Sequence, residues 1–256
     1  MTIILKSKQE IEKLRKANLV VSDVLDICEE MAKPGVSTWD MEIAARKYLE
    51  KVGAKSAFLN YKPAYDYSPF PAVLCTSVNE VVVHGIPNKD EILKEGDILS
   101  VDFGAFVEGY CGDSARTFPI GKVSPVAEKL IEATKRSLDL AIEKMEAGNR
   151  LLDIGFAVQS HVESQGFNVI RDFVGHGIGK KMHESPQVPN FGTPGRGILL
   201  KKGLVLAIEP MVVEGDYEIE VLDDGWTVVT RDGKLAAHFE HSVAITENGP
   251  FVLSRR

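Results

Sequence analysis

The sequence predicts an α+β fold built from two related halves. Helix-like segments occur in two pairs, strand-like runs follow each pair, and the second half repeats residues of the first half in the same order. The chain has 256 residues, of which 44% are hydrophobic and 26% are charged, an ordinary composition for a globular domain. We therefore expect a single domain over residues 1–256 with an internal repeat of approximately 8–121 and 124–253.

Four segments have the apolar spacing of amphipathic helices. They are residues 8–33, 38–52, 125–148 and 152–165. Ser7 and Glu10 form a capping box at the start of the first segment, and Ser124 with Pro125 occupies the N-cap and first-turn positions of the third. One glycine closes the second segment and another closes the fourth, which predicts where these helices end.

Two strand-like runs, ILSVDFGA and YCGDSARTF, flank the loop sequence FVEG and predict a hairpin. If the hairpin is symmetric about this loop, Asp102 and Asp113 face each other across the two strands. Like charges at directly opposed positions destabilise a strand pair. We therefore expect a source of positive charge beside these aspartates.

The repeat is clearest when Gly35 is placed on Gly148. Five identities then occur in 19 positions, against roughly one expected from ordinary residue usage. Further along, the sequence HGI occurs once in each half, and LKEGDILSVD lies on LKKGLVLAIE, which places Asp102 on Glu209. The alternative is a chance similarity between two amphipathic halves, but the matches fall on glycines and carboxylates rather than on generic apolar positions.

A looser match places Asp113 on Glu240. Two similar halves normally pack about a pseudo-two-fold axis, so equivalent residues converge near that axis. The convergent set contains four carboxylates and two imidazoles. These are Asp102, Asp113, Glu209, Glu240, His84 and His176.

Four carboxylates on apolar strands cannot all stay ionised in a low-dielectric cleft, because burial and mutual repulsion raise their pKa values. Two divalent cations would carry four positive charges against the four carboxylates. Oxygen-rich ligand sets favour ions such as Mn²⁺, Fe²⁺ or Co²⁺ over a sulfur-bound structural zinc. The sequence therefore predicts a two-metal site, of the kind that activates water for hydrolysis.

Each residue also has an ordinary explanation when it is taken alone. An aspartate beside a hairpin is usually a turn residue, Glu209 before a proline could end a strand, and Glu240 could face solvent. Among the other histidines, we expect His161 to be structural and His238 and His241 to lie beside the site at most. The glycine-rich stretch 191–197 lacks the ending of a phosphate-binding loop.

Charge and composition exclude several classes of partner. The net charge of −7 disfavours direct binding of nucleic acid or of an anionic membrane surface, and no apolar run is long enough for a signal peptide or a membrane span. The three cysteines are scattered and show no CxxC spacing, which is typical of reduced thiols in a cytoplasm. We therefore expect a cytoplasmic protein.

Several long motifs carry a family resemblance. They are NEVVVHGIP, DILSVDFG, GYCGDSARTF, GHGIGKKMHESPQVPN, AIEPM, DDGWTVVTRDG and AHFEHSVAIT. In these motifs the chain closely resembles the bacterial methionine aminopeptidases of type I, from about residue 3 to residue 253. The resemblance implies the pita-bread fold, with two pseudo-two-fold-related halves, an antiparallel sheet inside and helices outside. It also implies that the single domain is catalytic.

The resemblance implies a role for each convergent residue. Asp113 and Glu240 would bridge two metal ions, Asp102 would serve one ion, and His176 with Glu209 would serve the other. The ions would be two divalent cations, with Co, Mn, Fe, Zn and Ni as the candidates. Glu209 would also act as the proton shuttle for the attacking water.

The remaining roles concern the substrate. The resemblance implies that His183 hydrogen-bonds the scissile carbonyl as its oxygen gains charge, and that His84 contacts the peptide nitrogen beyond the scissile bond. The methionine side chain would enter an apolar pocket, where a thiol and aromatic rings suit a thioether. The residues near this pocket are Tyr67, Phe70, Cys75 and Trp226.

The implied function is metal-dependent removal of the initiator methionine from nascent polypeptide N-termini with a small second residue. The family also implies a monomer, with the ribosome as a candidate partner. Two alternatives remain. One is a proline-directed pita-bread aminopeptidase, which uses the same ligands but usually has an additional N-terminal domain. The other is a catalytically inactive pita-bread module that binds peptides.

Overall fold

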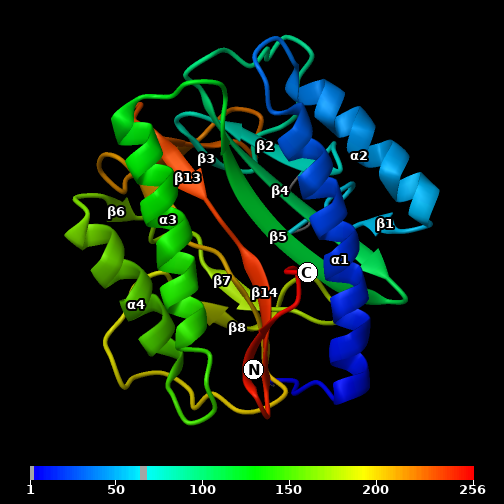
Figure 1. Cartoon of the computed structure of the whole chain (residues 1–256), viewed down its shortest axis with the longest axis vertical. Helices are drawn as coiled ribbons and strands as arrows, with labels where there is room; N and C mark the ends of the chain where they lie inside the picture. Colours follow the sequence, from blue (N-terminus) through cyan, green and yellow to red (C-terminus); the bar gives the residue numbers. More distant parts are fainter. Residues whose placement is uncertain (1–2, 64–67) are drawn as a thin grey trace.

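The structure is a computed structural model that describes residues 3–63 and 68–256. Four helices lie on the outside, with α1 and α2 on one side of the strands and α3 and α4 on the other (Figure 1). Their bounds are α1 Lys8–Met31, α2 Thr38–Val52, α3 Pro125–Glu143 and α4 Leu151–Ser164. This arrangement confirms the predicted α+β class and the two helix pairs.

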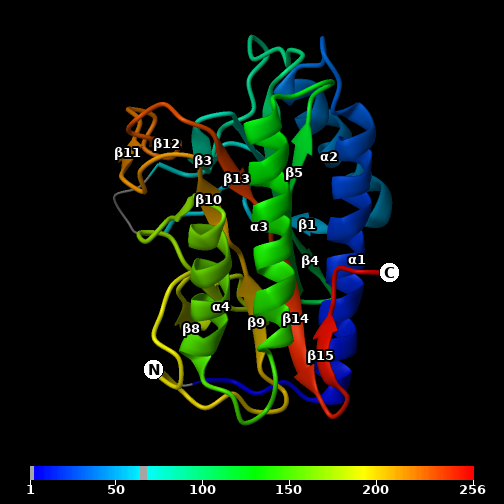
Figure 2. The same ribbon diagram turned by 60° about the vertical axis from the view of Figure 1, so that its left-hand side comes forward.

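The strands between the helix pairs form four antiparallel sheets within the described ranges. The first half contributes β1 Lys55–Ser56, β2 Leu74–Val78, β3 Val81–Val83, β4 Ile98–Val107 and β5 Tyr110–Pro119. The second half contributes β6 Asn168–Val169, β7 Gly175–Gly177, β8 Glu184–Val188, β9 Val205–Ile208, β10 Met211–Val213, β11 Ile219–Val221, β12 Val228–Thr230, β13 Ala236–His238, β14 His241–Thr246 and β15 Gly249–Val252. Figure 2 shows β11 and β12 at one edge of the molecule, away from α1 and α2.

The strand orders show which segments meet. One sheet joins β1, β4 and β2 with β5 on the free side of β4, and another runs β15-β14-β9-β7-β8. The two smaller sheets are β13-β10-β6 and β11-β12-β3. The last of these pairs a strand of the first half with two strands of the second half, so the halves share backbone hydrogen bonds as well as side-chain contacts.

The repeated residues have the same structural role in both halves. Asp40 accepts a hydrogen bond from the backbone N–H of Ser37 at 3.1 Å, and Asp153 accepts one from the N–H of Arg150 at 2.7 Å. Both aspartates therefore satisfy an unpaired donor in the first turn of a helix. This requirement explains why the sequence repeats an aspartate at this position.

The repeated glycines mark equivalent turns. Gly35 has φ +91° and its N–H donates to the carbonyl of Leu93 at 2.8 Å, while Gly148 has φ +104° and donates to Leu200 at 3.1 Å. Leu93 and Leu200 begin the two stretches that the repeat aligns. The left-handed conformation at both positions favours glycine, so chain geometry accounts for these identities.

The β4–β5 hairpin differs from its predicted register. The turn is formed by Glu108 and Gly109, with φ values of +51° and +80°. Asp102 consequently pairs with Ala115, and Asp113 pairs with Gly104. The prediction that the two aspartates stand directly opposite each other was wrong by two positions. They are instead diagonal neighbours on the same face, which keeps their carboxylates within reach of each other.

A seam of hydrogen bonds joins the two halves beside these aspartates. The Ser242 hydroxyl donates to the carbonyl of Asp113 at 2.9 Å, and the backbone N–H of Glu240 donates to the carbonyl of Ala115 at 2.9 Å. The Ser114 hydroxyl donates to the carbonyl of Glu240. These bonds fix the backbone of one predicted ligand from each half.

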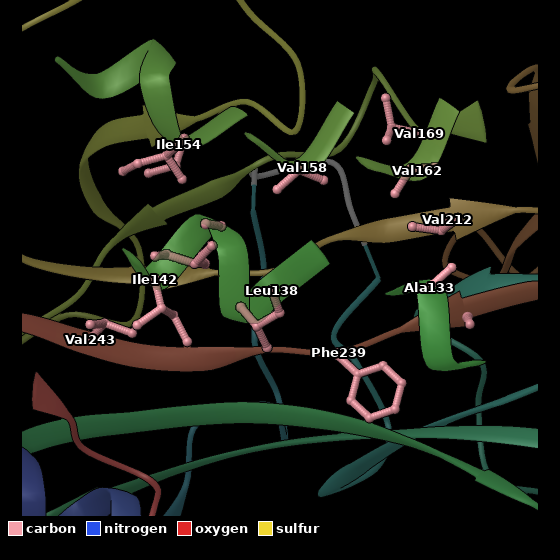
Figure 3. Packing of buried hydrophobic residues seen from close by; sticks show 14 of the residues in the cluster. Ala133, Leu138, Ile142, Ile154, Val158, Val162, Val169, Val212, Phe239 and Val243 are labelled. Atoms are coloured by element: carbon pink, nitrogen blue, oxygen red, sulfur yellow. The ribbon is translucent and has the colours of Figure 1, made fainter. Parts of the chain in front are cut away.

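The packing of the strands explains why acidic side chains gather on their inner side. Phe239 lies in the apolar core beneath α3 and α4, together with Leu138, Ile142 and Val158 (Figure 3). The next residue, Glu240, points the other way. The same alternation separates buried apolar residues from Asp102 and Glu209. Burial of each apolar side chain contributes on the order of 2 kcal/mol, so the cores fix the orientation of the acidic face.

Candidate metal centre and substrate cavity

Four carboxylates and one imidazole lie at the meeting point of the two halves. Asp113, His176 and Glu240 each offer a ligand atom, and these three atoms lie within 4.8 Å of one another. His176 Nε2 is 3.4 Å from Glu209 Oε1 and 3.9 Å from Asp113 Oδ2. Asp102 lines the same cavity as these residues. The structure therefore brings together all five residues that the sequence predicts as metal ligands.

The protonation of His176 is set by the backbone. Its Nδ1 lies 3.0 Å from the carbonyl oxygen of Gly177, which can only accept a hydrogen bond. Nδ1 therefore carries the proton, and Nε2 presents a lone pair toward Glu209 and Asp113. This tautomer is the one that a histidine needs to coordinate a metal through Nε2.

Burial dominates the electrostatics of the carboxylates. It raises the pKa of Asp102 to about 7 and raises the pKa of Asp113, Glu209 and Glu240 well above their ordinary values. Repulsion between the carboxylates adds to the shift, chiefly from Asp102 on Asp113 and Glu209 and from Asp113 on Glu240. Burial also lowers the pKa of His176 to about 3. Within the described ranges no lysine or arginine forms an ion pair with these four acids.

Divalent metal ions fit this environment. Asp102 Oδ1, Asp113 Oδ1 and Glu240 Oε1 are buried and have no hydrogen-bond partner in the described part of the chain. Buried polar atoms of folded proteins are nearly always paired, so three unpaired oxygens at one place call for a ligand. Carboxylate oxygens with one imidazole form a donor set that suits divalent cations, which also supply the missing positive charge.

The acidic cluster forms one wall of a cavity of about 450 Å³. Apolar side chains line the same cavity. Phe70 and Trp226 meet edge to face, with ring centroids 5.2 Å apart, and Cys75 lies beside them. These three residues were predicted to line a methionine pocket, and the structure places them in the cavity. Tyr67, the fourth predicted pocket residue, lies outside the described residues.

His84 lies on the same cavity in a strained conformation. Its φ is +61°, in the left-handed region that non-glycine residues adopt uncommonly. The ring packs edge to face against Phe173, with centroids 5.4 Å apart. Burial lowers the pKa of His84 to about 4, so the imidazole is neutral at physiological pH.

His183 lines the same cavity, beside His176. Its ring centroid is 4.3 Å from that of His176, and its Nδ1 is 2.7 Å from the hydroxyl oxygen of Tyr61. Tyr61 also lines the cavity, together with Phe58 and Phe173. None of these three residues was predicted as a site residue, because they lie in irregular segments without a repeat partner or a periodic pattern.

The other three histidines differ in where they lie relative to the cavity. His238 Nε2 lies 3.9 Å from Glu209 Oε2, so this residue does lie beside the site. His241 points away from the cavity, with its Nδ1 2.7 Å from the hydroxyl of Ser254. His161, on α4, is not among the residues that line the cavity.

The fold and the site together define a class. Two similar halves that enclose buried carboxylates and an imidazole, beside an apolar pocket, form a metal-dependent hydrolase of the pita-bread type. Comparison with known proteins then gives the family. The sequence model of metallopeptidase family M24 matches residues 12–247. The chain therefore belongs to metallopeptidase family M24.

Relatives within the family match along the whole chain. The methionine aminopeptidase of Clostridium acetobutylicum is 52% identical over 252 residues, covering 98% of this chain and 98% of the relative. The crystal structure of methionine aminopeptidase from Thermotoga maritima has a TM-score of 0.94 at 45% identity and is covered completely, as is this chain. The prolidase from Pyrococcus furiosus shares the fold, with a TM-score of 0.76 at 21% identity, but only 66% of it is covered.

These matches confirm the predicted resemblance and the pita-bread fold. Family membership also supports the expectation of divalent metal ions. Among the described residues, no helix combines the length and the apolar character needed to cross a bilayer.

Proposed function

We propose that this protein hydrolyses the peptide bond that follows an N-terminal methionine, with nascent proteins and peptides as substrates. The observation that carries the proposal is one cavity whose lining combines two kinds of side chain. A cluster of buried acids lines it together with Phe70, Cys75 and Trp226, and Cys75 pairs directly with Asp102 between β2 and β4. The apolar residues suit a thioether side chain, while the acids suit the metal-dependent chemistry of the scissile bond.

We further propose that the acidic wall holds two divalent ions, drawn from Co, Mn, Fe, Zn and Ni. Asp102, Asp113, His176, Glu209 and Glu240 would hold these ions, because all five line the cavity and Asp113, His176 and Glu240 form a compact ligand group. The family resemblance implies that Asp113 and Glu240 would be shared between the ions, that Asp102 would serve one ion, and that His176 and Glu209 would serve the other. Bound ions would neutralise the carboxylates, polarise the scissile carbonyl and lower the pKa of a coordinated water.

The protein residues have distinct tasks in the reaction. Glu209 accepts the proton of the attacking water and passes it to the leaving amine. His183 donates a hydrogen bond to the carbonyl oxygen, which gains negative charge in the transition state. His84 contacts the peptide nitrogen beyond the scissile bond, and its neutral imidazole avoids placing a positive charge beside that nitrogen.

The size of the cavity bears on which residues the substrate can carry at its first two positions. A cavity of about 450 Å³ can hold a methionine side chain and the bond to be cleaved. By analogy with the family, only small second residues are accepted. By analogy with the family, the substrate needs a free amino terminus. Formylated chains therefore require prior deformylation.

The activity is tested with matched tripeptides. With added Mn²⁺ or Co²⁺, we expect cleavage of Met-Ala-Ser and no cleavage of formyl-Met-Ala-Ser or Ala-Pro-Ala. Cleavage of Ala-Pro-Ala instead would support the proline-directed alternative. Cleavage of none of the peptides with any of the five metals would support the inactive binding module.

The remaining proposals concern the context of the activity. The whole chain, residues 1–256, acts as a single catalytic domain, with the two repeats at approximately 8–121 and 124–253. We place it in the cytoplasm as a monomer that meets nascent chains at the ribosome, without binding nucleic acid or a membrane directly. The net charge of −7 supports the last point.

A further inference from the structure

Tyr61 and His183 make a side-chain contact that links two distant parts of the chain. The Tyr61 hydroxyl oxygen lies 2.7 Å from His183 Nδ1, and the two rings meet at an interplanar angle of 62°. Either group could in principle donate. The phenol is the more acidic of the two and the imidazole nitrogen is the better acceptor, so the Tyr61 O–H donates to Nδ1.

The position of Tyr61 is held by its backbone. Its N–H donates to the carbonyl of Phe58 at 2.8 Å, and its own carbonyl accepts from the N–H of Phe70 at 3.0 Å. Phe70 in turn packs against Phe58 and Trp226. The hydroxyl therefore approaches His183 from a fixed direction, although the contact itself is open to solvent.

A hydrogen bond received at Nδ1 places the proton of the neutral ring on Nε2. Within the described ranges, His183 Nε2 has no hydrogen-bond partner. We propose that the Tyr61 hydroxyl fixes His183 in the Nε2–H tautomer, so that the two adjacent histidines of the cavity hold opposite tautomers. His176 keeps a lone pair on Nε2 for a metal, while His183 keeps a proton on Nε2 for the substrate carbonyl.

Tyr61 thus acts as a positioning residue rather than as a catalytic one. The part of the proposal that concerns the carbonyl rests on the proposed function, whereas the tautomer is a property of the protein alone. The tautomer is important because the other one would present a lone pair to the carbonyl oxygen. It would repel the developing negative charge instead of stabilising it.

The tautomer is measured directly by ¹⁵N NMR of the ring nitrogens in protein labelled at histidine. The spectra are recorded on metal-free and Zn²⁺-loaded protein, and the His183 signals are assigned with His183→Asn. We expect Nδ1 of His183 to resonate as a nitrogen with a lone pair and Nε2 as a protonated nitrogen. In Tyr61→Phe, which keeps the ring and loses only the hydroxyl, the two shifts should move toward each other as the tautomers exchange.

The same variant is assayed on Met-Ala-Ser. We expect kcat to fall on the order of tenfold, the effect of losing an orienting hydrogen bond, while KM changes much less. Tyr48→Phe is the matched control, because Tyr48 also donates its hydroxyl to a side chain but lies on α2, outside the cavity. It should leave both the spectra and the kinetics unchanged.

Three results would overturn the inference. They are protonation of His183 on Nδ1 in the unsubstituted protein, unchanged ring shifts in Tyr61→Phe, and a rise in KM with kcat unchanged. The last result would mean that Tyr61 only lines the pocket. If the unsubstituted protein cleaves no methionyl peptide, the proposed function fails, but the spectra still decide the tautomer.

Discussion

Lys6 and Glu184 form an ion pair that is almost completely buried. Lys6 Nζ lies 2.6 Å from Glu184 Oε2, and the two side chains are 4% and 9% exposed. The other carboxylate oxygen of Glu184 accepts a hydrogen bond from the N–H of Lys181 at 3.3 Å. Glu184 directly follows His183, so the pair ties the N-terminal segment to the loop that carries a proposed catalytic histidine.

Replacing Lys6 by Met should strongly destabilise the protein, because it leaves the Glu184 charge buried without a partner. We expect the free energy of unfolding to fall by about 3–5 kcal/mol. The control is Lys8→Met, since Lys8 pairs with Glu247 on the surface, where the side chains are 84% and 62% exposed. That change should stay within about 1 kcal/mol. Urea unfolding of both variants measures the difference, and equal losses would argue against a structural role for the buried pair.

Glu209→Gln should lower kcat on Met-Ala-Ser by orders of magnitude. The amide preserves the shape of the side chain but cannot take a proton from water. Metal content should fall only partly, because Asp102, Asp113, His176 and Glu240 remain. Glu220→Gln, on the exposed face of β11, is the control and should behave like the unsubstituted protein. Turnover and elemental analysis are measured on the same samples, and near-normal turnover would remove the proton-shuttle role.

His183→Ala should lower kcat on the order of a hundredfold, the usual effect of losing one donor to a developing oxyanion. Metal content should not change, because His183 is not one of the proposed ligands, although its ring packs against that of His176. His161→Ala, on α4 outside the cavity, provides the comparison and should retain full activity. If His183→Ala proved as active as His161→Ala, the carbonyl contact would have to be assigned elsewhere.

The stability of the metal-free protein should depend on pH in a characteristic direction. Unfolded carboxyl groups have pKa values of about 4, whereas burial raises the pKa of Asp102 to about 7 and raises the pKa of Asp113, Glu209 and Glu240 well above their ordinary values. The native state therefore binds more protons than the unfolded state between these values. The free energy of unfolding should fall as the pH rises from about 4 through about 7.

Buried histidines act in the opposite direction, but at lower pH. Burial lowers the pKa of His84 to about 4 and that of His176 and His238 to about 3, from an ordinary value of 6.5. Their stabilising contribution is complete above pH 6.5 and is lost as the pH falls below it. Between pH 6.5 and the ordinary thiol pKa of about 8.5, the decline in stability therefore reports the carboxylates; at higher pH the buried thiols of Cys28, Cys75 and Cys111, whose pKa values burial raises, add to it.

Added divalent metal should offset this decline. We expect the difference in melting temperature between metal-loaded and EDTA-treated protein to grow from neutral to alkaline pH, because the ions bind the ionised carboxylates. Glu240→Gln removes one titrating group and should flatten the slope of the metal-free protein. Thermal unfolding across the pH series measures both effects. Equal melting temperatures with and without EDTA would contradict a tightly held metal pair.

Much of the fold could be predicted because its signals are local. Ser7 and Glu10 form the expected capping box, and α2 spans the residues predicted from its apolar spacing. The end of α3 was predicted less well. The helix stops at Glu143 rather than near residue 148, because the Asn149 side chain donates to the carbonyl of Lys144 and the chain turns toward Leu200.

The hairpin register shows where local signals fail. Glu108 adopts a positive φ that glutamate rarely takes, and its carboxylate pairs with Lys16 on α1 at 2.8 Å. A contact across 92 residues thus helps to hold the turn, and the sequence of the loop alone does not reveal it. A shift of two positions preserves the side-chain faces of both strands, so the acidic face could be predicted although the pairing was wrong.

The candidate site likewise contains residues that the sequence pattern predicted and residues that only the tertiary contacts reveal. The repeat predicted that Asp102, Asp113, Glu209 and Glu240 converge, since the equivalence of two halves constrains residues far apart in the chain. Tyr61 has no counterpart in that repeat and reaches His183 across 122 residues. Only the packing of the irregular segment before β2 brings it there. The roles of the convergent residues stay predictions until the variants above are measured.

The hydrogen bonds between β5 and β14 join the two halves, here called lobes, and each lobe supplies part of the predicted metal site. Asp102 and Asp113 belong to one lobe and Glu209 and Glu240 to the other, and hydrogen bonds from Ser114 and Ser242 join them. If the backbone were cut in the connection between β5 and α3, each fragment would keep half of the acids and could not assemble the centre alone. Activity would return only when the fragments reassociate, so such a split chain would work as a reporter of proximity.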